Sequence, residues 1–319
     1  MEEKEYDLTI VVFCNKKDFY LTRICIASIR YFYKNIKIML VKDELNGDFS
    51  TSEIEKKYNI EVYDCGKKIF GWAASKTFFL LQMEKGRKYL LLDSDIVFIE
   101  PFLDPICANF ADSDLIVSAE YYKDLHGKDV RETYFDINKV LKYDENYIYP
   151  GYFFNTGQLF ISGGIIHYEY FSEFFDLNKF PYWKRLDIFP LVDQSLYNYI
   201  FPKLHTQNII RLVPKQFFIW GDGAAAKKIR LADIVSKNAT GGLIHWAGAK
   251  RTPFVKQMTR GDILTFFQEE YYKDLFMGSV LIKVRPARHL LYTYILRLKN
   301  KLKSIFGPQT IIKSMFPVI

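Results

Sequence analysis

Residues 89–99 read YLLLDSDIVFI, and two acids directly behind an apolar run make this the stretch that decides the fold. Tyr89 to Leu92 reads as a buried strand, and Ile96 to Ile99 continues the apolar pattern. Burying carboxylates costs free energy unless a positive group meets them. Asp93 and Asp95 are separated by one residue at the end of a central strand. They therefore predict a binding site for a divalent cation, and the bound cation could hold a diphosphate. The alternative interpretation is an ordinary turn.

A second acidic triplet, Asp112-Ser113-Asp114, stands in front of its apolar run, Leu115 to Val117, and not behind it. Ligands of open α/β sheets bind beyond the carboxyl ends of the strands. This copy thus lies at the wrong end of its strand, and we predict a solvated loop or a helix-capping element there.

The bulk composition indicates a folded chain with a large core. The chain has 319 residues, of which 49% are hydrophobic and 17% aromatic, enough for one large domain with or without an appendage. No cysteine pair has CxxC spacing, which favours buried free thiols in a reducing compartment. The acidic start of the chain has no apolar signal-peptide core, and no uncharged stretch is long enough to span a bilayer. The four cysteines are Cys14, Cys25, Cys65 and Cys107.

Strand and helix patterns alternate along the first hundred residues. This alternation predicts an α/β fold with a largely parallel sheet and helices on both faces. Residues 121–150 show little periodicity, so we expect either a lid or binding loop or a plain surface excursion there. The predicted strands are 9–13, 36–41, 60–63 and 89–92, and the predicted helices are 20–33, 51–58 and 75–84.

Three further motifs follow the first acidic triplet. Asn155-Thr156-Gly157 lies between apolar residues and predicts a bend that exposes an amide side chain. Asp193-Gln194 opens a helical run over 195–200, where an N-terminal cap is the simpler interpretation. Residues 245–251 read HWAGAKR directly after Leu243-Ile244, so a histidine, a glycine and two cations follow a strand end and could meet a metal-bound diphosphate.

In this order, the four motifs resemble those of family 8 glycosyltransferases of the GT-A fold, over roughly residues 8–255. The resemblance implies a Rossmann-like mixed, mostly parallel sheet and an enzyme that transfers a sugar from a nucleotide diphosphate with retention of configuration. Asp93, Asp95 and His245 match the family's metal ligands. Two carboxylates and an imidazole suit Mn²⁺ better than Mg²⁺, which stays the alternative.

The resemblance also assigns residues to the donor and to the chemistry. Two positions depart from the family pattern: Lys250 and Arg251 share the place of one lysine, and Asn15 or Asp18 stands where the family holds the base with an acid. A glutamine side chain is a poor nucleophile. Attack by the acceptor on the face of the sugar that the phosphate leaves is therefore favoured over a covalent intermediate on Gln194. The implied donor-binding residues are Asn15, Lys76, Asp93, Ser94, Gly248, Lys250 and Arg251, and the implied catalytic residues are Asn155, Asp193 and Gln194.

The implied substrates are a UDP-linked hexose, glucose or galactose, and a glycan or lipid-linked glycan acceptor such as those of lipopolysaccharide or capsule synthesis. Two other functions stay open. A sugar nucleotidyltransferase shares this sheet type but would have a glycine-rich loop where Asn15-Lys16-Lys17 stands. A non-catalytic relative would only bind a glycan or a partner.

The C-terminal region, residues 256–319, is predicted as a basic helical appendage to the catalytic domain of residues 1–255. From Gly278 onward the chain has eight basic residues and no acid, so the net charge of +7 belongs to this tail. Leu291, Ile295, Leu298, Leu302 and Ile305 form one helical stripe with cations beside it. This pattern is typical of an interfacial helix on an anionic membrane, and the alternative is a helix docked on the enzyme body. We therefore expect a cytoplasmic protein, peripheral on the inner face of the cell membrane, that binds no nucleic acid.

Overall fold

The computed structural model describes residues 5–71, 73–110, 112–247 and 251–306. The chain divides into two compact units, residues 1–247 and 248–319. The functional division predicted at residue 255 remains a prediction.

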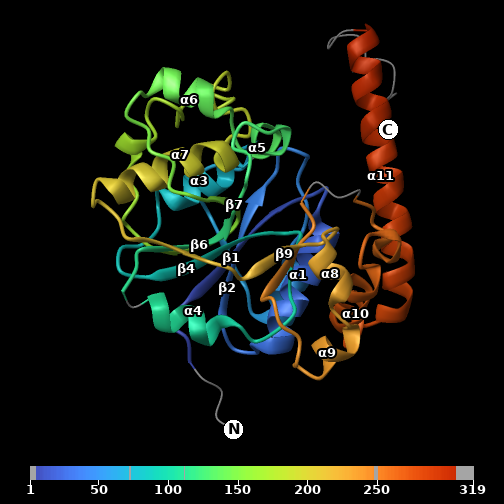
Figure 1. The fold of residues 1–319 in the computed structure, drawn as a ribbon. Helices are drawn as coiled ribbons and strands as arrows, with labels where there is room; N and C mark the ends of the chain where they lie inside the picture. Colours follow the sequence, from blue (N-terminus) through green and yellow to red (C-terminus); the bar gives the residue numbers. More distant parts are fainter. Residues whose placement is uncertain (1–4, 72, 111, 248–250, 307–319) are drawn as a thin grey trace. The chain divides into compact units, whose positions relative to one another are not determined.

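The first unit is built on a seven-stranded sheet with the order β3-β2-β1-β4-β7-β6-β8 (Figure 1). The pairs β1–β2, β1–β4, β2–β3 and β6–β8 are parallel, whereas both neighbours of β7 run antiparallel to it. The sheet is thus mixed and mostly parallel, as predicted. Its strands are β1 (Thr9–Asn15), β2 (Lys37–Asp43), β3 (Glu61–Tyr63), β4 (Lys88–Asp93), β6 (Leu115–Glu120), β7 (Phe153–Ser162) and β8 (Leu212–Lys215).

The reversed direction of β7 places its first residues at the edge where β4 ends. Leu92 pairs with Gln158, so the chain on the N-terminal side of Gln158 lies beside the acidic triplet. Asn155-Thr156-Gly157 lies within this strand, at an irregularity where the register with β6 shifts from Ala119–Phe154 to Val117–Leu159. β4 pairs with residues 158–162 of β7 and β6 with residues 153–154 and 159–161, so paired segments flank the irregularity. The side chain of Asn155 is buried, so the predicted exposed amide is wrong.

A second, three-stranded sheet has the order β5-β10-β9, formed by β5 (Ile96–Phe98), β10 (Leu243–His245) and β9 (Phe218–Trp220). The chain turns at Ser94 and Asp95 between β4 and β5. The apolar run after the triplet is therefore a separate strand in another sheet, rather than a continuation of β4.

Helices cover both faces of the large sheet, as predicted. In Figure 1, α3, α5, α6 and α7 lie on one side of it and α1 and α4 on the other. The first side holds an aromatic core in which Tyr134 stacks on Phe153, with ring centroids 4.4 Å apart. The helices of this unit are α1 (Phe19–Phe32), α2 (Ser52–Tyr58), α3 (Ala74–Leu80), α4 (Leu103–Phe110), α5 (Lys128–Thr133), α6 (Ile137–Tyr143), η1 (Tyr168–Tyr170), α7 (Asp193–Thr206), α8 (Ala224–Lys228) and α9 (Leu231–Val235).

The segment 121–150 is more ordered than its sequence suggests. It contains α5 and α6, and its residues Tyr134 and Phe135 are fully buried. Helices of six or seven residues are too short to show a clear period, which explains why the sequence pattern does not reveal them. All four cysteines are free thiols, and three of them are buried.

The second unit contains η2 (Val255–Gln257), α10 (Gly261–Tyr272) and α11 (Gly278–Phe306). Within the described residues, we find no helix that combines the length and the apolar character needed to cross a bilayer. Leu291, Ile295 and Leu298 of the predicted stripe are exposed on α11. The side chains of Leu302 and Ile305 lie outside the described part of the chain.

Candidate active site

The small sheet brings His245 to the acidic triplet. His245 ends β10 and pairs with Ile96 of β5, the residue directly after Asp95. The backbone N–H of Trp246 donates to the carbonyl oxygen of Asp95 at 3.0 Å. One ligand atom each of Asp93, Asp95 and His245 can be chosen so that all three lie within 4.8 Å of one another. Residues far apart in the chain thus form one cluster, as the family resemblance implied.

The chemistry of this cluster fits a divalent cation. Asp95 and His245 are 3% and 2% exposed, and Asp95 Oδ1 lies 3.2 Å from His245 Nε2. Neither ring nitrogen of His245 has a hydrogen-bond partner among the described residues, although both are buried. An unsatisfied buried polar atom is costly, and a bound cation would remove that cost.

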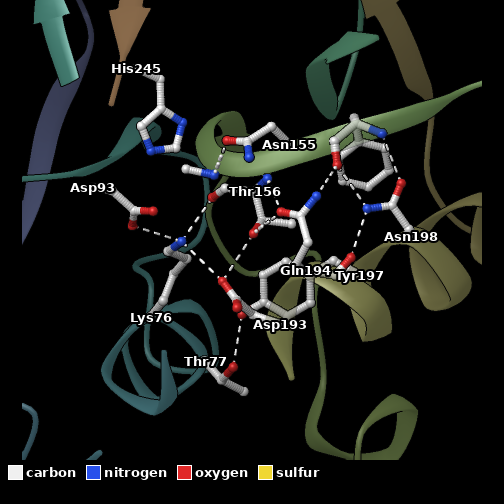
Figure 2. A network of polar contacts seen from close by, with 12 residues as sticks. Lys76, Thr77, Asp93, Asn155, Thr156, Asp193, Gln194, Tyr197, Asn198 and His245 are labelled. Atoms are coloured by element: carbon white, nitrogen blue, oxygen red, sulfur yellow. Dashed lines mark hydrogen bonds and ion pairs between the residues drawn. The ribbon is translucent and has the colours of Figure 1, made fainter. Parts of the chain in front are cut away.

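Lys76 of α3 forms ion pairs with Asp93 and Asp193 (Figure 2). Its Nζ donates to Asp93 Oδ1 at 2.9 Å, to Asp193 Oδ2 at 3.0 Å and to the carbonyl oxygen of Thr156 at 2.8 Å. Burial disfavours the ammonium, but Asp193 and Asp93 outweigh this effect and raise the pKa of Lys76. Lys76 is therefore a permanent cation with its three N–H groups already engaged.

The formal charges of these side chains sum to a net negative charge that a divalent cation would balance. With His245 counted as an uncharged ligand, Asp93, Asp95 and Asp193 contribute three formal negative charges and Lys76 contributes one formal positive charge. Two negative charges therefore remain in a largely buried cluster. Divalent cations are commonly the largest local charges in such sites, and one here would balance the cluster.

Gly157 lies at the centre of the cluster, although its sequence context predicts no role for it. A Cβ at this position would overlap His245 Cε1 and would lie 2.7 Å from Asn155 Oδ1 and 3.0 Å from Asp93 Oδ2. A side chain at 157 would thus occupy the space between the predicted ligands. The antiparallel register of β4 and β7 creates this close approach, and the sequence holds no local sign of it.

The first turns of α7 bind the start of β7. Gln194 Oε1 accepts the N–H of Thr156 at 2.9 Å, and its Nε2 donates to the carbonyl oxygen of Phe154 at 3.1 Å. Thr156 Oγ1 lies within hydrogen-bond distance of Asp193 Oδ2 and Gln194 Oε1. Asn155 Oδ1 accepts the N–H of Gly157 at 2.8 Å. Asn155, Asp193 and Gln194 thus gather beside the metal-ligand cluster with their side chains held in place (Figure 2).

Two solved glycosyltransferases have a similar arrangement of elements. An apo structure of the bifunctional glycosyltransferase WbbM matches 88% of this chain at a TM-score of 0.57 and 14% identity, and the match covers 52% of that chain. This chain thus spans about half of the WbbM chain. The galactosyltransferase LgtC, solved with donor and acceptor sugar analogues, matches 83% of this chain and 95% of its own at a TM-score of 0.53 and 15% identity. The fold is GT-A.

At 14% and 15% identity, these similarities establish the fold and leave the activity to be argued from the site. No family model matches the chain, and no curated protein matches it. Within the GT-A sheet, the cluster occupies the edge beyond the carboxyl ends of the parallel strands, where ligands of such sheets bind.

Asn15 and Ser94 are the other predicted donor residues that lie in the first unit. Asn15 ends β1 next to β4, and its side chain forms a local turn with Lys17 and Asp18. Ser94 is buried in the turn between the two acids. Arg251 belongs to the second unit, and Gly248 and Lys250 lie outside the described residues.

Trp220 is a second site residue that the sequence alone does not reveal. It ends β9 and pairs with His245 in the small sheet, so the two side chains leave the same face. Their rings are stacked, with centroids 5.5 Å apart and an interplanar angle of 17°. Nothing in the local sequence around Phe218–Trp220 indicates this contact, since it depends on the pairing of β9 with β10.

Proposed function

We propose that this protein is a metal-dependent glycosyltransferase that moves a hexose from a nucleotide diphosphate donor to a hydroxyl group of a glycan, with retention of configuration. The observation that carries the proposal is the meeting of Asp93, Asp95 and His245 at the ligand-binding edge of a GT-A sheet. Mn²⁺ is the cation that the two carboxylates and one imidazole favour, with Mg²⁺ as the alternative.

Asp93, Asp95 and His245 would hold the cation, which as a Lewis acid would stabilise the negative charge that develops on the leaving diphosphate. Lys76 fixes Asp93 through a 2.9 Å ion pair and connects it to Asp193 on α7. Because Lys76 stays charged at neutral pH, it also lowers the cost of keeping these acids ionised beside each other. In our proposal, Lys250 and Arg251 add positive charge for the diphosphate.

Gln194 is held too firmly, and its oxygen is too weakly basic, to act as a nucleophile. Both ends of its amide bind the start of β7, and its oxygen lies within hydrogen-bond distance of two donors from Thr156. We therefore propose attack by the acceptor hydroxyl on the same face of the sugar that the diphosphate leaves. Asp193 and Asn155 would orient sugar hydroxyl groups on that face.

UDP-hexose is the donor that we propose, with Asn15 or Asp18 next to the base and Ser94 near the ribose and phosphates. The similarity to LgtC, a galactosyltransferase solved with donor and acceptor sugar analogues, supports a hexose and a sugar acceptor.

The decisive experiment is the release of nucleoside diphosphate from a panel of sugar donors, with and without Mn²⁺. We expect release from a UDP-hexose that stops when EDTA removes the metal and resumes when Mn²⁺ is restored. A folded protein that binds Mn²⁺ and glycan but turns over no donor would instead be the non-catalytic binding protein.

The proposed acceptor is a lipid-linked glycan, reached by a protein that is peripheral on the cytoplasmic face of the membrane. Exposed apolar side chains along α11 and exposed cations beside them support an interfacial helix. The apolar residues are Val280, Val284, Leu291, Ile295 and Leu298, and the cations are Lys283, Arg288, Arg297 and Lys301.

Vesicle sedimentation tests the membrane proposal with the full chain. We expect binding to vesicles that contain phosphatidylglycerol. Binding should weaken after Lys283, Arg288, Arg297 and Lys301 are changed to glutamine, since each contributes about 1 kcal/mol near an anionic surface. The same binding to neutral vesicles, or no effect of the four changes, would contradict the proposal.

A further inference from the structure

Two aromatic rings pack against His245 in addition to the acids of the metal-ligand cluster. Trp220 stacks on its ring at 5.5 Å, and Phe218 contacts it edge-on at 6.3 Å with an interplanar angle of 64°. The backbone of Gly157 closes against Cε1. The ring plane of His245 is thus set by surrounding groups that form no hydrogen bond with it.

Metal-binding histidines are normally oriented by a hydrogen bond from the ring nitrogen that does not bind the metal. In this chain Nε2 is the nitrogen near Asp95, which leaves Nδ1 for that orienting bond. Nδ1 is buried and has no such partner among the described residues. The stacked indole of Trp220 is a contact that can set the plane of the ring without such a bond.

The indole of Trp220 is itself anchored by a carboxylate. Its Nε1 donates to Glu120 Oε1 at 2.6 Å, and the hydroxyl group of Tyr134 donates to Glu120 Oε2 at 2.6 Å. Tyr134 is fully buried. Packing alone would not require a partly buried acid at the end of β6, because burying a carboxylate costs free energy unless donors meet it.

We propose that Glu120 and Trp220 are positioning residues for the metal-ligand cluster: Glu120 fixes the indole, and the indole fixes the plane in which His245 presents its nitrogen to the cation. This inference rests on the metal site of the proposed function. It adds a second layer of residues, from the ends of β6 and β9, to a site whose ligands come from the end of β4, the turn after it and β10.

Titration of the full chain with Mn²⁺ alone, followed by electron paramagnetic resonance, tests this layer. Trp220→Leu removes the stacked ring, and we expect about tenfold weaker Mn²⁺ binding, as is usual when residues supporting a metal ligand are lost. Glu120→Ala leaves the ring but frees it, and we expect a smaller loss of the same sign. Trp220→Phe keeps a flat ring and should restore most of the affinity.

Electron spin echo modulation from the imidazole nitrogen separates positioning from general damage. We expect Trp220→Leu to retain Mn²⁺ on the carboxylates while the nitrogen modulation is lost, as in His245→Gln. Trp183→Leu is the matched control, since Trp183 packs on Phe175, and it should retain both the affinity and the modulation.

Three outcomes would overturn the inference. Wild-type affinity and nitrogen modulation in folded Trp220→Leu and Glu120→Ala would show that His245 needs no such support. If Trp220→Leu does not fold, unchanged binding by Glu120→Ala alone leads to the same conclusion. If the wild-type chain binds no Mn²⁺, the metal-dependent function fails, and the inference fails with it.

Discussion

The two Asp-Ser-Asp triplets of this chain have the same sequence but different structural surroundings. Asp93-Ser94-Asp95 begins at the last residue of β4, where Asp93 pairs with Lys76 and Asp95 lies beside His245. Asp112-Ser113-Asp114 lies in the loop before β6, in agreement with one of its two predictions, and there Asp114 Oδ2 accepts the backbone N–H of Arg211 at 2.7 Å. The first triplet gathers charged side chains from distant segments, and the second holds the start of β8. Whether a triplet lies at the C-terminal or the N-terminal end of its strand decides which other groups can reach its acids.

The largest difference between the triplets should appear in catalysis. Asp95→Asn should lower turnover about 100-fold or more, because it removes a charged ligand from the proposed metal site while retaining the shape of the side chain. Steady-state kinetics with UDP-hexose at saturating Mn²⁺ measures the loss, and circular dichroism confirms the fold. Full turnover by a folded Asp95→Asn protein would exclude the metal assignment.

Lys76 explains how the first triplet remains stable beside Asp193. Lys76→Met should cost about 3–5 kcal/mol of unfolding free energy, because it leaves buried carboxylates without their cation. Lys203→Met is the matched control: Lys203 pairs with Asp144 at 2.6 Å but is itself exposed, so about 1 kcal/mol or less is expected. Urea denaturation measures both, and equal losses would contradict the buried-cation role.

The pH dependence of stability sharpens the same point. The raised pKa of Lys76 means that its contribution is complete below about pH 10 and is lost only as the pH rises through that raised value. The wild-type contribution of Lys76 should therefore be constant from about pH 6 to pH 9. Lys76→Met should instead gain stability as the pH falls below 7, since protonation relieves its unpaired acids. A variant that loses stability there at the wild-type rate would disprove this account.

Substitution of Gly157 tests whether the space between the predicted metal ligands must stay free of a side chain. Gly157→Ala should weaken Mn²⁺ binding about tenfold and cost about 1–3 kcal/mol, because the added methyl group overlaps the ring of His245. Gly127→Ala is the control, as a Cβ there meets atoms no nearer than 3.1 Å. Calorimetric titration and thermal unfolding measure the two effects, and wild-type behaviour of Gly157→Ala would show that the cluster adjusts freely.

The smallest effect is expected at the second triplet. Asp114→Asn should leave turnover unchanged and cost about 1 kcal/mol, the value of one partly exposed hydrogen bond to the backbone of Arg211. Thermal unfolding and the donor assay check both parts. A large loss of turnover would mean that position along the strand does not separate the two triplets.

Three local patterns in the sequence mislead for the same physical reason. The residues of Asn155-Thr156-Gly157 favour a turn with an exposed amide, yet paired segments on either side hold them within β7, and Asn155 is buried. The apolar run after Asp95 continues the apolar pattern of β4 in the sequence, although it enters the small sheet. The aperiodic segment 121–150 contains two helices with a buried aromatic core. In each case contacts with distant residues override a local preference.

The sequence by itself determined the strands of the parallel core, the helices beside them and the acids at the end of β4, because apolar runs and their polar ends are local properties of a chain. The order of the motifs also implied, through the family resemblance, that His245 joins Asp93 and Asp95. Only the tertiary structure decided that Gly157 leaves room for these side chains and that Trp220 and Glu120 support the ring of His245. Those contacts depend on antiparallel pairing of β5 with β10 and on the reversal of β7. Strand order and direction arise from packing the whole chain, so a single segment carries no sign of them.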